Sequence, residues 1–491
     1  MPRVTRTGQT LSPDPRRVIA KPYLPGEEIG PSGDSRARLL LQRILMIPEA
    51  QVAALLADVL ANFSTRHRDF EEFLQRHFDL AVHLLGFTEP VSPERRMLIG
   101  AYFTHEYSVE AAALFNPSIV LHPDQRHLGP GQSRFVMSLR AVGEGHISSI
   151  EFRSGLIDST GALTLDLLGH QLITGKRAPP DGYDKRQFFA KLTELGAANE
   201  IAVSVLAGLD ERFTLAELDR SLGRLEQEGT PHAIRYETTK MIRVLASSNY
   251  VTSFPTDSAL SERVIFPAGP NETHGMEDAR FVRFVEDDGS IRYYATYTAF
   301  DGYEILPQLI ETKDFVSFTI STLNGSAAQN KGMALFPRRI GGRYVMLSRK
   351  DRENLHIATS NDVRLWDDVE ALYQPTQPWE LLQIGNCGSP LETDAGWLVL
   401  TRGVGPMRRY AIGALLLDLE HPSRVLGHLP DPLLVPDQSE REGYVPNVLY
   451  SCGGLIHGDQ LVLPYGFSDH GVSIALVSLP ELLAELQPPG T

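Results

Sequence analysis

The chain has 491 residues, of which 42% are hydrophobic and 22% charged, and its formal net charge is -15. These values are typical of a folded globular protein, and the length predicts two or three packed units or one architecture that grows by repetition. The acidic balance argues against a general nucleic-acid binder, and no apolar run reaches the roughly 18 residues of a membrane span.

The N-terminal sequence and the cysteines bear on location. MPRVTRTGQTLSPDPRR is basic but contains no apolar segment, so it lacks the pattern of a secretory signal. The only cysteines are Cys387 and Cys452, which argues against a disulfide framework and makes the cytoplasm the expected location. The histidines and carboxylates lack metal-ligand spacing, so no metal or organic cofactor is predicted.

Two regions are predicted ahead of the strands. Residues 1–34 are rich in Pro, Gly and charge, and we expect an extended arm on the surface. Residues 35–112 have helical periodicity and predict a domain of about four helices. Pro48 is expected in the first turn of the second helix, and Ser92 and Pro93 as N-cap and first residue of the fourth.

From residue 113 onward the pattern is that of strands, and it repeats five times. Each copy has an apolar strand that ends in a polar residue, then a short loop and a second strand. The first strands are FVMSLRAV (135–142), YYATYTAF (293–300), YVMLSR (344–349), WLVLTRG (397–403) and LVLPYG (461–466). The last four copies begin roughly 50 to 65 residues apart, which is the length of a propeller blade.

A helical insertion at residues 185–248, with Thr230 and Pro231 as an N-cap pair, explains the longer gap after the first copy. The predicted fold is therefore mainly β. It is a five-bladed β-propeller at residues 113–488, with an N-terminal α-helical domain and the helical insertion in the first blade.

The ends of the five inner strands should face one axial pocket. The polar residues there are Arg140, Asp301, Arg349, Arg402 and Asp469. Three guanidinium groups in one cavity repel each other unless an anion lies among them, and their planar shape suits phosphate or carboxylate. Lys331 is a fourth candidate cation. The alternatives are polar strand ends that simply meet solvent, and arginines in surface salt bridges.

The stretch GMEDARF (275–281) contains the candidate catalytic acid. Adjacent residues in a strand point to opposite faces, so only one of Glu277 and Asp278 is expected to face the pocket. A glycosidase normally needs two carboxylates at the bond, whereas phosphate is itself a nucleophile. A single acid beside an anion site is therefore typical of phosphorolysis.

Eight segments resemble, in order, the signature segments of glycoside hydrolase family 130, the β-mannoside phosphorylases and β-1,2-mannosidases. They are FNPSIV, LRAVGEG, GMEDARFV, NKGMALFPRRIGGRYVMLSR, GWLVLTRGV, YAIGALLLD, GYVPNVLY and YGFSDHGVSIAL. The extra helical regions are similar to those of longer members, which include β-1,2-oligomannan phosphorylases. The resemblance implies reversible, inverting phosphorolysis of β-1,2-linked manno-oligosaccharides to α-mannose 1-phosphate, with phosphate as co-substrate.

The resemblance also implies residue roles. Asp278 matches the catalytic acid, which acts through the 3-hydroxyl of the transferred mannosyl unit. From pattern and resemblance together, the substrate-binding candidates are Asn116, Arg140, Asp301, Asp469 and Glu442, and the phosphate-binding candidates are Lys331, Arg349 and Arg402. Arg402 departs from the histidine usual in the family. It keeps the positive charge that phosphate needs, with a different anion or a larger acceptor as alternatives.

Three other functions remain as alternatives. The first is a β-1,2-mannosidase, in which Glu442 would be a second acid roughly 6.5 to 9.5 Å from Asp278. The second is a β-mannosyltransferase with the same acid, and the third is a non-catalytic glycan-binding propeller. His146 and Tyr444 are further candidates for substrate contact, with a plain turn and a blade closure as the alternatives. The helical domain is a candidate for homo-oligomer formation.

Overall fold

The computed structural model describes residues 2–26, 35–169, 171–225 and 232–488. Its internal contacts divide the chain into two units. The larger unit comprises Met1–Pro13, Ala112–Leu168 and Gly175–Thr491, and the smaller comprises Asp14–Ala111 and Gly169–Thr174. No single helix in the described ranges is long and apolar enough to cross a membrane, although α1 (Arg36–Leu45) and α2 (Glu49–Phe63), bent by 114° at their junction, together have the length and composition to do so.

Four helices pack together in the smaller unit. They are α1 (Arg36–Leu45), α2 (Glu49–Phe63), α3 (Phe70–Leu85) and α4 (Pro93–Tyr102), and β2 (Val18–Pro22) pairs with β3 (Thr104–Ser108) beside them. The Ser92 hydroxyl accepts from the backbone of Arg95 at 3.1 Å and Pro93 opens α4, as predicted. Pro48 differs from the prediction by one position, because α2 begins at Glu49 and Pro48 is its N-cap with extended backbone.

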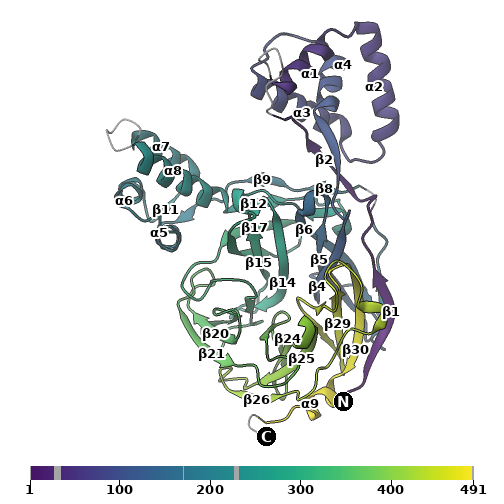
Figure 1. Cartoon of the computed structure of the whole chain (residues 1–491), viewed down its shortest axis with the longest axis vertical. Coiled ribbons are helices and arrows are strands. Elements are labelled where there is room, and N and C mark those ends of the chain that lie inside the picture. The colour runs from purple at the N-terminus through teal and green to yellow at the C-terminus, as the bar shows by residue number, and fades with distance from the viewer. Residues whose placement is uncertain (1, 27–34, 170, 226–231, 489–491) are drawn as a thin grey trace. The chain divides into compact units, whose positions relative to one another are not determined.

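The five predicted strand pairs are present in the larger unit as antiparallel hairpins. They are β5 (Ser133–Val142) with β6 (Ser148–Ile157), β15 (Ile291–Phe300) with β16 (Ile305–Thr312), β19 (Tyr344–Ser348) with β20 (Leu355–Ser360), β24 (Gly396–Val404) with β25 (Tyr410–Leu417), and β29 (Gln460–Phe467) with β30 (Gly471–Ser478). In Figure 1 the hairpins follow one another around a ring in this order. The larger unit is mainly β.

Further strands extend the hairpins into sheets. The first two hairpins belong to one sheet, because Gly275 at the start of β14 lies opposite Ser148 of β6 in a short parallel pairing. The added strands are β4 (Ala113–Leu121), β7 (Leu163–Leu165), β9 (Lys176–Ala178), β12 (Tyr250–Ser253), β13 (Arg263–Ile265), β14 (Gly275–Val285), β17 (Ser317–Thr322), β18 (Ala334–Leu335), β21 (Asp368–Tyr373), β22 (Gln383–Asn386), β23 (Leu391–Thr393), β26 (Val425–His428), β27 (Leu449–Tyr450) and β28 (Leu455–His457).

The predicted surface arm is in part a strand of the C-terminal sheet. β1 (Val4–Leu11) pairs antiparallel with β30, so both ends of the described chain belong to one sheet. The Arg6 guanidinium donates to both carboxylate oxygens of buried Glu440, at 3.1 and 2.9 Å. The predicted arm is extended and lies at the surface in this segment, and in addition β1 supplies partners to backbone groups of β30 that a bare edge would leave unpaired.

The helical insertion has a core of its own. Its elements are β10 (Tyr183–Asp184), α5 (Lys185–Glu194), α6 (Glu200–Ala207), β11 (Arg212–Phe213), α7 (Leu215–Leu225) and α8 (His232–Ser247). Phe188, Leu192, Val205 and Leu222 are buried among these elements. Thr230 and Pro231, the predicted cap pair, lie outside the described residues. One short helix, α9 (Leu479–Ala484), follows β30.

Candidate active site

Asn116 and Asp278 are brought together by two β-bulges. The register of β14 with β15 shifts between Glu277 and Arg280, and that of β4 with β5 shifts between Phe115 and Ser118. Asp278 has a φ of 55° and Asn116 a φ of 49°, a conformation that typically costs a non-glycine residue about 1 to 3 kcal/mol. Nδ2 of Asn116 donates to Oδ1 of Asp278 at 2.7 Å. Such strain is typical of a functional site.

Both acids of GMEDARF contact one guanidinium group. Arg140 reaches Glu277 at 2.9 Å and Asp278 at 3.4 Å, and Lys331 donates to the other oxygen of Glu277. The prediction that strand alternation separates the two acids is therefore wrong. The reason is the bulge, which adds a residue to β14 and interrupts the alternation at Asp278.

Asp469 joins this group electrostatically. It lies in the turn between β29 and β30, where Ser468 and Asp469 have φ values of 48° and 50°. Burial and the negative charge of Asp278 raise the pKa of Asp469 to about 6, against the opposing charge of Arg140. We call Asn116, Arg140, Glu277, Asp278, Lys331 and Asp469 the acid cluster.

Asp278 itself is held as a carboxylate. Burial would raise its pKa, but the charges of Arg140 and Arg280, the hydrogen bond from Asn116 and the charge of Lys331 together lower it. Interaction with Glu277, Asp278 and Asp469 in turn raises the pKa of Arg140, although burial opposes this. In the protein alone, Asp278 therefore has no proton to donate near neutral pH.

Arg349 and Arg402, which we call the arginine pair, form a second group. A Cβ built on Gly385 of β22 would lie 3.4 Å from Cδ of Arg349 and 3.4 Å from Nη2 of Arg402, so the two side chains flank the same backbone. Arg402 donates to Gln383 at 3.0 Å. Burial and the charge of Arg402 lower the pKa of Arg349 to about 10.

The arginine pair lacks a counter-charge within the described part of the chain. Neither guanidinium forms an ion pair there, and the buried Nε atom of each lacks a hydrogen-bond partner. Buried charges are costly unless they are paired, and two like charges side by side add to the cost. The arrangement therefore suits an anion with several oxygen atoms.

Arg280 and Tyr450, neither of which is among the residues predicted from the sequence, connect the two groups. Arg280 donates to the backbone oxygen of Asp278 at 2.9 Å and to the Tyr450 hydroxyl, and the Arg402 guanidinium lies 5.4 Å from the centre of the Tyr450 ring. The spacing of two between Asp278 and Arg280 was the one available signal for Arg280. Tyr450 lies in GYVPNVLY, one of the eight segments that resemble the family, but nothing in that segment indicates that its hydroxyl contacts a polar site.

Three predicted site residues, Asp301, Glu442 and Lys331, make contacts other than the predicted ones or none in the described structure. Asp301 caps the turn between β15 and β16, where its carboxylate accepts from the backbone of Tyr303 at 2.9 Å and Glu304 at 2.7 Å. Glu442 is exposed and has no hydrogen bond or ion pair with a residue that the structure describes. Lys331 contacts the acid cluster rather than the arginine pair. The proposed roles of these three residues stay predictions.

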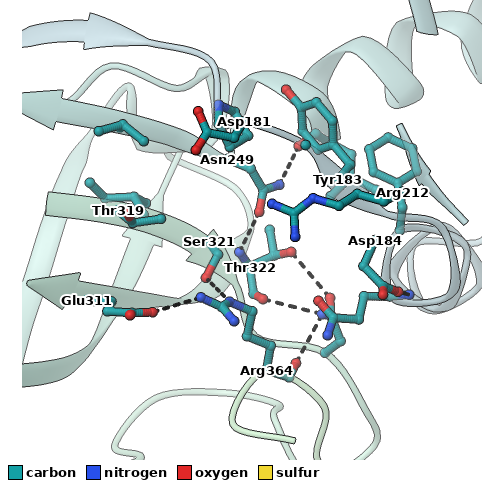
Figure 2. Close-up of a pocket in the computed structure, with 18 of the residues that line it drawn as sticks. Asp181, Tyr183, Asp184, Arg212, Asn249, Glu311, Thr319, Ser321, Thr322 and Arg364 are labelled. Carbon is teal, nitrogen blue, oxygen red and sulfur yellow. Dashed lines mark hydrogen bonds and ion pairs between the residues drawn. The ribbon is translucent and has the colours of Figure 1, made fainter. Parts of the chain in front are cut away.

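A separate polar cavity of ≈ 600 Å³ lies between the helical insertion and β17 (Figure 2). Arg364 donates there to Glu311 at 2.8 Å and to Ser321 at 3.2 Å, and Asn249 accepts from the backbone of Thr322 at 3.0 Å. These contacts join strands to loops, and none of the predicted site residues lines the cavity. The candidate active site is therefore the acid cluster with the arginine pair.

The Asp469 carboxylate leads to a prediction on stability. The pKa of Asp469 in the folded state is about 6, raised from 3.8. The protonated carboxyl therefore stabilises the folded state below pH 3.8, and this contribution to the free energy of unfolding is lost as the pH rises through 6. Asp469→Asn removes that loss and is expected to stabilise the protein by about 3 kcal/mol at pH 7.5 and by little at pH 4. Urea unfolding at both pH values measures this, with Asp301→Asn as the matched control. An equal effect of Asp469→Asn at both pH values would contradict the prediction.

The chain is similar to known β-mannoside phosphorylases. Residues 251–487 match a family model described as beta-1,4-mannooligosaccharide phosphorylase. The chain is 34% identical over 227 residues to a 1,2-beta-oligomannan phosphorylase of Thermoanaerobacter sp. (strain X514), which covers 44% of this chain and 74% of the relative. It is 30% identical over 231 residues to a beta-1,2-mannobiose phosphorylase of Listeria innocua, which covers 45% and 63%. The solved structure of a beta-1,2-mannobiose phosphorylase from Listeria innocua has a TM-score of 0.46 to this chain at 21% identity, over 82% of this chain and 95% of that one.

These sequence matches identify the chain as a glycoside phosphorylase. The chain belongs to glycoside hydrolase family 130. The matched segment contains Asp278, the arginine pair and Asp469, whereas Asn116 and Arg140 lie ahead of it.

Proposed function

We propose that this enzyme catalyses the reversible, inverting phosphorolysis of β-1,2-linked manno-oligosaccharides. The products are α-mannose 1-phosphate and an oligosaccharide shortened by one unit. The observation that carries the proposal is the arginine pair, which has no counter-charge among the residues that the structure describes and is joined to Asp278 through Arg280 and Tyr450. The β-1,2 linkage is supported by the activities for which two of the similar proteins are named.

In this proposal a phosphate oxygen bonds to the anomeric carbon while the glycosidic C–O bond breaks. The proton of Asp278 passes to the leaving oxygen through the 3-hydroxyl of the mannosyl unit. Asn116, Arg140 and Asp469 hold that unit, and the arginine pair holds the phosphate. Burial raises the pKa of Tyr450 to about 12, so its hydroxyl, which accepts from Arg280, keeps a proton to donate to the anion.

The arrangement suggests how Asp278 acquires its proton. The cations that lower the pKa of Asp278 include Arg280. Arg280 donates to the hydroxyl of Tyr450, and Arg402 of the arginine pair lies over the ring of the same tyrosine. A bound phosphate adds negative charge beside those cations and weakens their effect on the carboxylate. Phosphate binding is therefore expected to raise the pKa of Asp278 and to ready it as an acid.

The five hairpins, in their order around a ring, support our proposal that residues 113–488 form a five-bladed β-propeller (Figure 1). We propose further that residues 35–112 and 185–248 are a helical domain and an insertion added to it, and that the enzyme acts in the cytoplasm. No contact of Glu442 in the described structure favours the hydrolytic alternative, so hydrolysis is an outcome of the test below.

Omission of phosphate tests the proposed function. With β-1,2-mannobiose and phosphate, the enzyme is expected to release equal amounts of mannose 1-phosphate and mannose. Without phosphate, turnover is expected to fall at least 100-fold, because water replaces phosphate poorly as the nucleophile when no general base activates it. Chromatography of the products measures both. Continued release of mannose without phosphate would identify a hydrolase, and elongated products alone would identify a transferase.

A further inference from the structure

Tyr444 and His146 form a stacked ring pair on the surface. Their ring centres are 5.6 Å apart and their planes differ by 28°. The two residues come from distant segments, the turn between β5 and β6 and the loop ahead of β27. Tyr444 is 71% exposed although it has this partner. A single exposed tyrosine is ordinary, but an exposed ring held by a second ring from another hairpin is preorganised for contact.

The backbone on both sides of Tyr444 is fixed against the turn that carries Asp469. Val445 donates to the backbone oxygen of Ser468 at 3.1 Å. A Cβ built on Gly443 would lie 2.5 Å from that same oxygen, so no larger residue fits there without a shift. The Ser468 hydroxyl in turn donates to the backbone oxygen of Glu440 at 2.6 Å. The backbone that carries Tyr444 therefore lies against the turn that carries Asp469 of the acid cluster.

His146 is held by its turn. It has a φ of 59° and follows Gly145 with a φ of 65°, and its backbone donates to Gly143 at 3.2 Å. The strand before this turn carries Arg140 of the acid cluster. Both rings are therefore anchored in segments that also position residues of the acid cluster.

The ring pair and the arginine pair come from different hairpins. Arg349 and Arg402 belong to the β19 and β24 hairpins, whereas the ring pair joins the turn between β5 and β6 to the loop ahead of β27. In an inverting displacement the nucleophile and the leaving group lie on opposite faces of the sugar. If the arginine pair holds the nucleophile, the leaving oligosaccharide extends away from that pair, and the ring pair, anchored at the turn that carries Asp469, is available to contact it.

We propose that Tyr444, stacked on His146, is the binding platform for a sugar unit of the acceptor, the part of the oligosaccharide that leaves. This inference rests on the proposed function. The flat face of a tyrosine ring packs against the C–H face of a pyranose while its hydroxyl stays in water. The platform would therefore set the affinity for the oligosaccharide without touching the phosphate or the acid.

Substitution of Tyr444 tests the platform. Tyr444→Ala is expected to raise the KM for β-1,2-manno-oligosaccharide in phosphorolysis, and the acceptor KM in synthesis, about tenfold, as for loss of one aromatic stacking contact. The KM for phosphate is expected to stay within twofold. Tyr444→Phe keeps the ring and should restore both oligosaccharide values. Tyr236→Ala removes a tyrosine of α8 that is 57% exposed and serves as the matched control.

A binding measurement separates this inference from the proposed function. Titration calorimetry with β-1,2-mannotriose is made on Asp278→Asn protein, with and without Tyr444→Ala. Weaker binding with Tyr444→Ala supports the platform, and equal affinity overturns it. A parallel rise in the phosphate KM would also overturn it, since that indicates a general disturbance of the site. If wild-type enzyme releases no mannose 1-phosphate, the proposed function fails, and the titration still decides the platform.

Discussion

Asp278→Asn is expected to lower kcat for phosphorolysis of β-1,2-mannobiose about 10³-fold, within the range for loss of a general acid. The amide keeps the shape of the carboxyl, and its oxygen can still accept the hydrogen bond from Asn116. The KM for the disaccharide should therefore change less than about threefold. Initial rates of mannose 1-phosphate release measure both quantities.

The neighbouring acid is the control for this assignment. Glu277→Gln removes a charge that pairs with Arg140 and Lys331, but no proton donor, and a loss of about tenfold is expected. A p-nitrophenyl β-mannoside, whose leaving group needs no proton, should recover most of the activity of Asp278→Asn. Near-normal turnover of mannobiose by Asp278→Asn, or a larger loss in Glu277→Gln, would show that the acid is assigned to the wrong residue.

Arg402→Met is expected to raise the KM for phosphate 10- to 100-fold, because a charge-assisted hydrogen bond is worth about 1.5 to 3 kcal/mol. The KM for the oligosaccharide should remain nearly unchanged. In phosphate-free buffer the same variant should unfold at a higher temperature than the wild type. The reason is that burial and the neighbouring charge of Arg402 both disfavour the charged form of Arg349, and the substitution removes that neighbouring charge. Initial-rate kinetics and thermal unfolding measure the two effects.

Two further variants sharpen this prediction. Arg402→His should bind phosphate better at pH 6 than at pH 8, since a free histidine titrates near 6.5. Arg338→Met removes a guanidinium that pairs with Glu392 outside the site and should leave the phosphate KM unchanged. An unchanged phosphate KM in Arg402→Met, together with an unchanged unfolding temperature, would mean that the arginine pair is not the anion site.

Local patterns were sufficient for much of the fold. The five strand pairs were recovered because each is a hairpin whose two strands are adjacent in sequence, so short-range alternation and turn residues specify it. The pairing of β1 with β30 was missed because its partner lies more than 450 residues away, and no local pattern carries that information. The helices were recovered for the same reason as the hairpins.

The candidate site, like the fold, was predictable from the sequence only in part. The sequence by itself marked the candidate residues, Asp278, Arg140 and the arginine pair among them, because strand ends and the family segments single them out. Only the tertiary structure decided how they meet. The bulge at Asp278 brings both acids to Arg140. Tyr450 links Arg280, which donates to its hydroxyl, to Arg402, which lies over its ring, and the Asp301 carboxylate closes a turn. Bulges and contacts between separate sheets depend on packing between distant segments, which a one-dimensional pattern does not encode.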